Sequence, residues 1–193
     1  MPSKRTHRSP ELPAATQRAA DARARRPAGR RESLYAFTYV DSPLGQLLIA
    51  GDERSLRLIG FPSGSRATTP GPGWRRDDGR FASVAEQLRS YFAGELKQFD
   101  LTLRTSGTAF QTSVWSALRR IPHGQTVTYA ELALSIGRPS AVRAVGAANG
   151  ANPLPIVVPC HRVIGTNGSL TGFGGGLDAK RFLLDHEKQV AGR

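Results

Sequence analysis

At residues 153–163 the sequence reads PLPIVVPCHRV, and this stretch contains Cys160, the one cysteine of the chain. The run Ile156-Val157-Val158 is short, β-branched and bounded by prolines, which predicts a buried strand segment or a stiff extended stretch. Pro159 fixes its own φ and restricts the residue before it to extended geometry, so the backbone should hold the thiol in place. An imidazole and a guanidinium follow the cysteine, and such neighbours lower a thiol pKa and favour the nucleophilic thiolate.

A single cysteine behind valines is more often an inert, buried side chain than a nucleophile. The adjacent histidine does not by itself decide between the two interpretations. The choice depends on what the rest of the chain places around Cys160.

Length and charge restrict the possible functions. A chain of 193 residues suits one large domain or two small ones, and its formal net charge of +12 calls for an anionic partner such as nucleic acid. Residues 1–31 hold nine Lys or Arg against two acids, a net +7, which leaves +5 for the other 162 residues. This segment is rich in Pro, Ala and Arg and poor in large aliphatic residues, so we predict a disordered basic tail over residues 1–32.

The sequence also bears on location. The tail has no apolar core, so it is not a secretory signal peptide. An Arg-rich, acid-poor leader does resemble an organellar transit peptide, and that interpretation stays open. No stretch is long enough to span a bilayer, so no membrane partner is expected. One cysteine forms neither an internal disulfide nor a multi-cysteine zinc site, so we expect a reducing cytoplasmic compartment and predict no metal ligands.

Residues 33–106 read as a small α/β scaffold domain. Three apolar runs separated by turns predict an antiparallel meander. These strands are expected at residues 34–40, 46–50 and 55–61. The Gly-, Pro-, Ser- and Arg-rich residues 62–79 predict a poorly ordered loop, and helical spacing over 81–92 predicts a helix that stops at Gly94. Residues 99–103 are a candidate for one more strand. No ionisable residues cluster with catalytic spacing, so this domain is predicted to be structural.

Residues 107–193 are predicted to form a mainly helical domain with a helix-turn-helix. Thr128 and Glu131 have the spacing of a capping box that opens a helix over 129–136, and Gly137 suits the residue after that helix. A second helix is expected at about 141–148, in the place of a helix that enters a DNA groove.

That second helix is unusually thin, because alanines and a glycine surround its single charge, Arg143. A small-residue face that packs tightly against a neighbour is one interpretation. The other is a slim helix that approaches DNA closely with one guanidinium. One arginine argues against base reading and favours shape-based or minor-groove contact.

Helices are also predicted over 110–121 and 177–186, with a glycine-rich loop at 171–176 before the last one. The loop has neither the spacing of a dinucleotide-binding motif nor that of a P-loop, so its glycines are expected to bring bare backbone close to a ligand. Glu187 would lie at the end of the last helix, where the helix dipole disfavours a carboxylate, and this hints at another purpose for it.

These motifs together resemble one family. Pro159-Cys160-His161-Arg162-Val163, the upstream Arg143-Ala144-Val145-Gly146, Asn152-Pro153 and the glycine-rich loop closely resemble the O6-alkylguanine-DNA alkyltransferases, also called methylated-DNA–protein-cysteine methyltransferases. The resemblance runs from about residue 110 to 187. It implies an α+β fold, in which a small three-stranded antiparallel sheet domain with a helix precedes a mainly helical domain that carries the helix-turn-helix and the active-site cysteine.

The resemblance implies direct-reversal DNA repair by a suicide reaction. Cys160 would take the alkyl group from O6 of guanine, with O4 of thymine as an open alternative, and keep it as a thioether in one irreversible turnover. His161, through a water, would draw the thiol proton, and Glu187 would orient the imidazole, as in a nucleophilic triad. Asn152 would hold the tight turn around the cysteine, and Tyr129 would donate a proton towards N3 of the leaving guanine.

The resemblance also implies the DNA and base contacts. The residues expected to contact DNA are Thr128, Arg143, Ala144 and Gly146. Arg143 would fill the stack when the damaged base rotates out. The residues expected to contact the base are Val163, Pro155, Phe173 and Gly174: the Val163 and Cys160 carbonyls would read the guanine amine, the Gly174 amide would face O6, and Pro155 would wall the pocket.

Some positions depart from the family pattern. Phe173 stands where many members have tyrosine, and Gly150 stands where several have a basic residue that contacts phosphate. A one-cysteine chain has no room for the zinc domain of the regulatory members, and its Cys160 separates it from the alkyltransferase-like proteins. The expected partner is double-stranded DNA containing alkylated guanine, bound by a monomer without a cofactor.

Two other function classes remain as alternatives. A non-catalytic lesion sensor would use the helix-turn-helix alone, but it has no need of Cys160, His161, Asn152 and Glu187 together. A Cys-His thiol hydrolase needs an oxyanion hole and a deacylating water, and nothing in the sequence identifies either.

Overall fold

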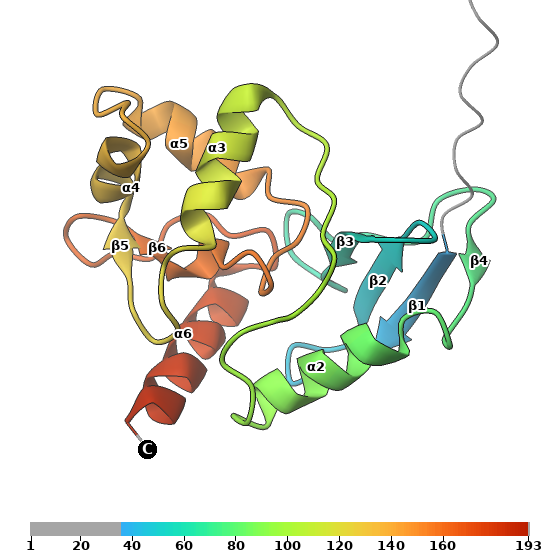
Figure 1. The fold of residues 1–193 in the computed structure, drawn as a ribbon. Helices are drawn as coiled ribbons and strands as arrows, with labels where there is room; N and C mark the ends of the chain where they lie inside the picture. The colour runs from blue at the N-terminus through green and yellow to red at the C-terminus, as the bar shows by residue number, and fades with distance from the viewer. Residues whose placement is uncertain (1–35, 193) are drawn as a thin grey trace, which may run out of the picture. The chain divides into compact units, whose positions relative to one another are not determined.

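The computed structural model describes residues 36–192. The predicted basic tail and the first residues of the first predicted strand therefore lie outside the described residues. In the described part, an N-terminal sheet domain precedes a C-terminal helical domain, and residues 36–192 belong to one compact unit (Figure 1). The predicted α+β fold is confirmed.

The sheet domain is built on a short antiparallel meander. Its strands are β1 (Ala36–Val40), β2 (Leu47–Gly51), β3 (Leu56–Gly60) and β4 (Arg75–Arg76), in the order β3-β2-β1-β4. The first three pair antiparallel as predicted, with Thr38 opposite Ile49 and Ile49 opposite Ile59. β4 pairs parallel to β1 and was not predicted, because two exposed arginines carry no apolar alternation.

Helix α2 (Ala82–Phe92) lies along this sheet (Figure 1). Its apolar face, which includes Leu88 and Tyr91, is fully buried, and Gly94 follows with a φ of 80°, as expected at a helix stop. The candidate strand at 99–103 forms a single bridge between Leu103 and Leu56 instead of a strand.

The helical domain contains the predicted helix-turn-helix. Its elements are α3 (Ala109–Leu118), β5 (Val127–Thr128), α4 (Tyr129–Ser135), α5 (Val142–Gly150), the 3-10 turn η1 (Cys160–Arg162), β6 (Val163–Ile164) and α6 (Leu177–Ala191). Thr128 and Glu131 form the predicted capping box at the start of α4, and Gly137 has a φ of 68° between α4 and α5. Tyr129 follows the short parallel ladder of β5 and β6, which holds the start of α4 beside the end of η1.

The run Ile156-Val157-Val158 is not a strand. It is buried as predicted, but the chain turns there: Ile156 has a φ of 74°, and the Val158 amide donates to Leu154 O at 2.8 Å. Three nearby prolines remove backbone donors, so a ladder is unavailable, and the Asn152 side chain closes the turn instead.

Helix α6 extends beyond its predicted end. It runs to Ala191 because its apolar and buried positions continue past residue 186, with Glu187 and Val190 both buried. Glu187 therefore lies inside the helix, so the premise that it stands at the helix end was wrong. Its burial, rather than the dipole, is what distinguishes this carboxylate.

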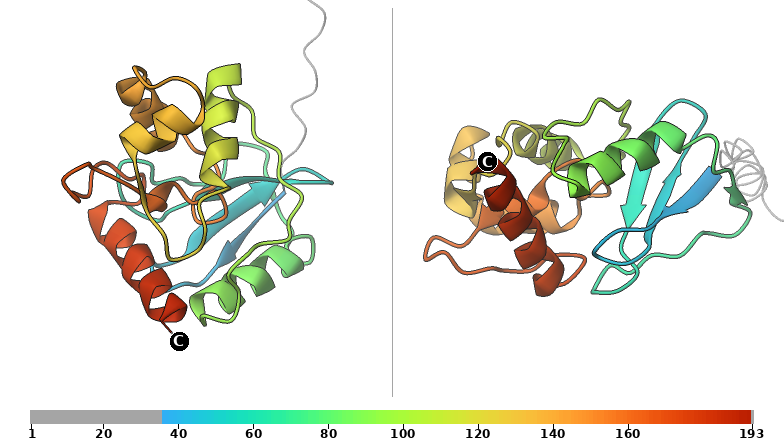
Figure 2. Two further views of the ribbon diagram at one scale, coloured as in Figure 1. Left: turned by 60° about the vertical axis from the view of Figure 1, so that its left-hand side comes forward. Right: turned by 90° about the horizontal axis from the view of Figure 1, so that it is seen from below.

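The two domains pack against each other (Figure 2). Ile59 N donates to Pro153 O at 2.9 Å, and the rings of Phe61 and Phe173 lie 5.4 Å apart. A Cβ added to Gly175 would lie 2.8 Å from the Phe61 ring, so the glycine-rich loop and the sheet domain meet at a distance that a larger residue would not permit. The loop over residues 62–79, which was predicted to be poorly ordered, takes part in this contact, because Arg66 N donates to Gly174 O at 3.0 Å.

Within residues 36–192, no helix is long and apolar enough to cross a membrane. The same part of the chain contains no group of three or more His, Cys, Asp or Glu side chains placed to hold a metal ion.

Candidate active site

Cys160 begins η1 and is buried, with 5% of its surface exposed. Two asparagines near the end of α5 hold the backbone around it. Asn152 Nδ2 donates to Val158 O at 2.7 Å, and its Oδ1 accepts from Leu154 N at 3.0 Å. Asn149 Nδ2 donates to Cys160 O at 3.3 Å. The thiol is thus placed by a turn that side chains close, which is the role the resemblance implies for Asn152.

The thiol is not activated in the resting structure. Burial raises the pKa of Cys160 to about 11, although the Asn152 hydrogen bond and the charges of Lys180 and Arg66 lower it in part. The predicted lowering of this pKa by the neighbouring guanidinium was wrong, because Arg162 turns to the carboxylate of Glu187. At neutral pH the thiol keeps its proton, so nucleophilic attack requires a base.

Glu187 is the acceptor at the centre of a buried polar network. Its side chain is 1% exposed and accepts five hydrogen bonds. Oε1 accepts from Tyr91 Oη (2.8 Å), His161 Nε2 (2.9 Å) and Arg162 Nη2 (2.8 Å), and Oε2 accepts from Arg162 Nε (2.8 Å) and Gly124 N (3.0 Å). Burial would raise the pKa of Glu187, but the hydrogen bonds and charges of His161 and Arg162 outweigh it and hold the pKa well below its usual value. The carboxylate is therefore ionised.

His161 is fully buried beside this carboxylate. Burial lowers its pKa, despite the opposing effect of Glu187, so the imidazole is neutral at pH 7. With Nε2–H donating to Glu187, the lone pair lies on Nδ1, and this atom has no hydrogen-bond partner among the described residues. Such an imidazole is oriented by its carboxylate and free to accept a proton.

The sheet domain contributes to this site, which the sequence did not reveal. Tyr91 reaches Glu187 from α2 through a buried hydrogen bond of 2.8 Å. In the sequence it is one more apolar position at helical spacing, and nothing separates it from the core residues around it. Arg66, in the loop after β3, lines the cavity at the thiol.

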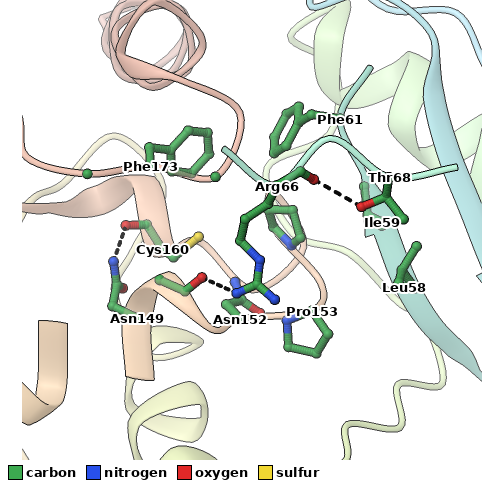
Figure 3. A pocket seen from close by; sticks show the side chains of 14 residues that line it. Leu58, Ile59, Phe61, Arg66, Thr68, Asn149, Asn152, Pro153, Cys160 and Phe173 are labelled. Carbon is green, nitrogen blue, oxygen red and sulfur yellow. Dashed lines mark hydrogen bonds between the residues drawn. The ribbon is translucent and has the colours of Figure 1, made fainter. Parts of the chain in front are cut away.

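A cavity of about 80 Å³ opens at Cys160 between the two domains (Figure 3). The helical domain supplies the predicted base-pocket residues Pro155, Phe173 and Gly174 together with Asn152. The sheet domain supplies Leu58, Ile59, Phe61, Arg66 and Thr68. Walls that combine apolar side chains with a few polar groups around a single thiol suit a small group bound for reaction with it.

The remaining predicted residues lie around α4 and α5. Tyr129 Oη accepts from Thr171 Oγ1 at 3.1 Å, and its ring lies close to Gly146, where an added Cβ would be 3.9 Å away. Arg143 and Ala144 are exposed on α5.

Two predicted residues already have internal partners. The Thr128 hydroxyl both accepts from Glu131 N and donates to the Glu131 carboxylate, so it is occupied by the helix cap. Val163 O accepts from Lys180 Nζ at 2.6 Å, and Lys180 also donates to Thr171 O at 3.0 Å. Lys180 is fully buried and was missed in the sequence, where it looks like a surface residue of an amphipathic helix.

Known proteins resemble both domains. The family profile described as 6-O-methylguanine DNA methyltransferase, ribonuclease-like domain, matches residues 35–105, and the profile of the DNA binding domain of the same family matches residues 109–189. The methylated-DNA–protein-cysteine methyltransferase of Methanosarcina acetivorans is 50% identical over 151 residues, which cover 78% of this chain and 97% of that protein. Its counterpart from Mycobacterium tuberculosis is 49% identical over 161 residues, 80% of this chain and 93% of that protein.

A solved structure agrees with these relatives. The crystal structure of Mycobacterium tuberculosis OGT in complex with DNA superposes with a TM-score of 0.75 at 48% identity, and covers 81% of this chain and 93% of that one. The resemblance seen in the sequence is confirmed: the chain belongs to the 6-O-methylguanine DNA methyltransferase family of DNA-repair proteins, which transfer a methyl group from DNA to a cysteine of the protein.

Proposed function

We propose that Cys160 is the methyl acceptor and that the protein repairs O6-alkylguanine in double-stranded DNA in a single irreversible turnover. One observation carries this proposal. The only cysteine of the chain opens on a cavity next to a neutral, buried His161 that Glu187 orients. A protein that only bound DNA would gain nothing from burying a carboxylate, an imidazole and a guanidinium together, because their desolvation is costly.

The reaction begins with removal of the thiol proton. His161 Nδ1 takes this proton through a water, and the resulting imidazolium is stabilised by the ionised Glu187. The Cys160 thiolate then attacks the alkyl carbon in line with its bond to O6. An S–C bond forms, the C–O6 bond breaks, and its electron pair stays on guanine. The Tyr129 hydroxyl supplies a proton towards N3, so guanine leaves neutral.

The product explains why the protein acts once. A thioether has no leaving group that water displaces, and no second cysteine exists to accept the alkyl group. Asn152 holds the turn in place throughout, and the Cys160 and Val163 carbonyls, each with a second lone pair, read the guanine amine. The Gly174 amide faces O6, with Pro155 and Phe173 beside the alkyl group.

DNA binding is assigned to α5 and its surroundings. The exposed Arg143 and Ala144 lie on a thin helix, in which Gly146 lies beside the Tyr129 ring. Arg143 occupies the stack after the damaged base rotates out, since O6 is not reachable in line inside a duplex. Thr128 contacts the phosphate backbone when its hydroxyl proton turns from the Glu131 carboxylate to a phosphate oxygen.

We further propose that the protein works as a cytoplasmic monomer with domains at 33–106 and 107–193. The single cysteine supports this proposal, as does the assignment of DNA binding to the helical domain alone. The free protein would then sediment as a monomer, and it would bind a short duplex with one copy per lesion.

Intact-protein mass spectrometry tests the proposed function. After incubation with duplex DNA that contains one O6-methylguanine, each chain should gain one methyl group on the peptide that holds Cys160. Cys160→Ala should gain none while its circular dichroism and DNA affinity stay close to those of the wild type. Stoichiometric methylation of this variant, or none of the wild type, would refute the assignment.

A further inference from the structure

The sheet domain places one charged side chain, Arg66, at the cavity where the alkyl group is transferred. Of the described residues that line this cavity, Arg66 alone carries a formal charge. No carboxylate lies within ion-pair distance of it in residues 36–192. The walls therefore hold an uncompensated cation and offer no anion.

Arg66 is held across the junction of the two domains. Its amide donates to Gly174 O at 3.0 Å, and a Cβ built on Gly174 would lie 3.2 Å from Cβ and Cδ of Arg66, so its stem packs on the glycine-rich loop. Nη1 donates to Gly150 O, at the end of α5. Figure 3 shows the side chain extending from its loop toward Asn152 and Pro153, with the Cys160 sulfur pointing toward it.

This anchoring leaves hydrogen-bonding capacity unused. The guanidinium has five N–H donors in a planar fork that matches a carboxylate. Neither Nε nor Nη2 has a hydrogen-bond partner within the described part of the chain. Arg66 as a whole is exposed, so the fork faces solvent as well as the cavity.

We propose that Arg66 makes this protein favour alkyl groups that carry a carboxylate, such as O6-carboxymethylguanine, over neutral groups of the same size. The inference rests on the proposed function, since the alkyl group must lie beside Cys160. A carboxymethyl group has four heavy atoms, and a cavity of about 80 Å³ accommodates several water-sized groups at roughly 10–15 Å³ each. A charge-assisted hydrogen bond to the guanidinium would hold its carboxylate and leave the methylene carbon towards the thiol.

The transfer step balances as it does for methyl. The Cys160 thiolate forms a bond to the methylene carbon, the bond from that carbon to O6 breaks, and guanine leaves with the electron pair and gains a proton. The product is S-carboxymethylcysteine. No oxidant, reductant or further reactant is needed.

The test compares two duplexes whose lesions differ only in the functional group at the end of the alkyl chain. One contains O6-carboxymethylguanine and the other O6-carbamoylmethylguanine, which is neutral and nearly isosteric. The rate of transfer to Cys160 is measured for each by quenched intact-mass spectrometry, and the ratio of the two rates is compared between the wild type and Arg66→Met. Because the ratio is taken within each protein, changes in thiol pKa, DNA affinity or folding affect both substrates alike and cancel.

We expect Arg66→Met to lower the ratio of the carboxymethyl rate to the carbamoylmethyl rate roughly tenfold. A fully buried guanidinium would have a larger effect, but solvent screens this exposed one. Arg66→Lys should keep part of the preference, because the charge stays while the planar fork is lost. Arg54→Met, which removes an exposed arginine from the turn before β3, serves as the matched control and should leave the ratio unchanged. Higher salt should lower the ratio of the carboxymethyl rate to the carbamoylmethyl rate in the wild type, because salt screens the charge of Arg66.

An unchanged ratio of the two rates in Arg66→Met would overturn the inference. If both substrates slowed equally, Arg66 would be assigned to folding or to phosphate contact. The proposed function fails separately, if the wild type takes no methyl from O6-methylguanine at Cys160.

Discussion

Replacing Glu187 with glutamine is expected to destabilise the protein far more than its small change in shape suggests. The carboxylate accepts five hydrogen bonds and balances a guanidinium whose side chain is only 8% exposed. Arg162 donates to both oxygens, through Nη2 to Oε1 and through Nε to Oε2, each at 2.8 Å. Whichever way the amide of Glu187→Gln is turned, its NH₂ therefore faces an N–H of Arg162.

The magnitude follows from this geometry. One guanidinium donor loses its acceptor, and the Arg162 charge stays buried without compensation, which costs about 3–5 kcal/mol. For a chain of this size each kcal/mol lowers Tm by about 2–4 °C, so the expected drop is roughly 6–20 °C. The transfer rate to free O6-benzylguanine should fall as well, because His161 loses the carboxylate that orients it.

Thermal and urea unfolding measure the stability, and mass spectrometry measures the rate. The control is Glu86→Gln, which also breaks a pair with an arginine, Arg89 at 2.8 Å, but at side chains that are 61–71% exposed. This control should change stability by less than about 1 kcal/mol. Equal and small losses in Glu187→Gln and Glu86→Gln would refute the view that the buried Arg162 charge depends on Glu187 for its compensation.

Four further outcomes are expected. Tyr91→Phe should lose about 1–2 kcal/mol in urea unfolding, less than Glu187→Gln, because the carboxylate keeps four donors; a loss as large as that of Glu187→Gln would contradict this ranking. Arg143→Ala should slow repair of duplex DNA much more than reaction with free O6-benzylguanine, since only the duplex requires base extrusion, and equal losses would assign Arg143 to folding or chemistry. The lowered pKa of His161 means that below about pH 6.5 the unfolded chain binds a proton that the folded chain does not, so stability should fall as pH drops; His161→Gln should flatten this slope, and an unchanged slope would exclude His161 as its source. Deleting residues 1–31 should weaken duplex binding without changing the rate on free base, and the slope of log affinity against log salt should fall by about 0.9 for each phosphate that the protein no longer neutralises, whereas an unchanged slope would leave the tail without a role in DNA binding.

Much of the helical domain was predictable because its signals are local. The capping box of Thr128 and Glu131 and the glycine at 137 depend on neighbours within a few residues, and both appear in the structure where they were expected. The motif around Cys160 was specific enough to indicate the family, which the comparisons confirm. The β-branched run at 156–158 misled, because its burial was read as a strand while Asn152 closes it as a turn.

By itself, the sequence determined the order of the first three strands and of the five helices, the family, and the single nucleophile, since these depend on residue types and on spacing along the chain. Only the tertiary structure decided the environment of that nucleophile. The thiol pKa depends on burial, Glu187 becomes an ionised acceptor because five donors converge on it, and Tyr91 and Arg66 reach the site from a domain that looked purely structural. Desolvation and hydrogen bonding act between groups that are close in space. Residue 66 reaches the cavity at Cys160, and residue 91 reaches Glu187, only when the two domains pack together.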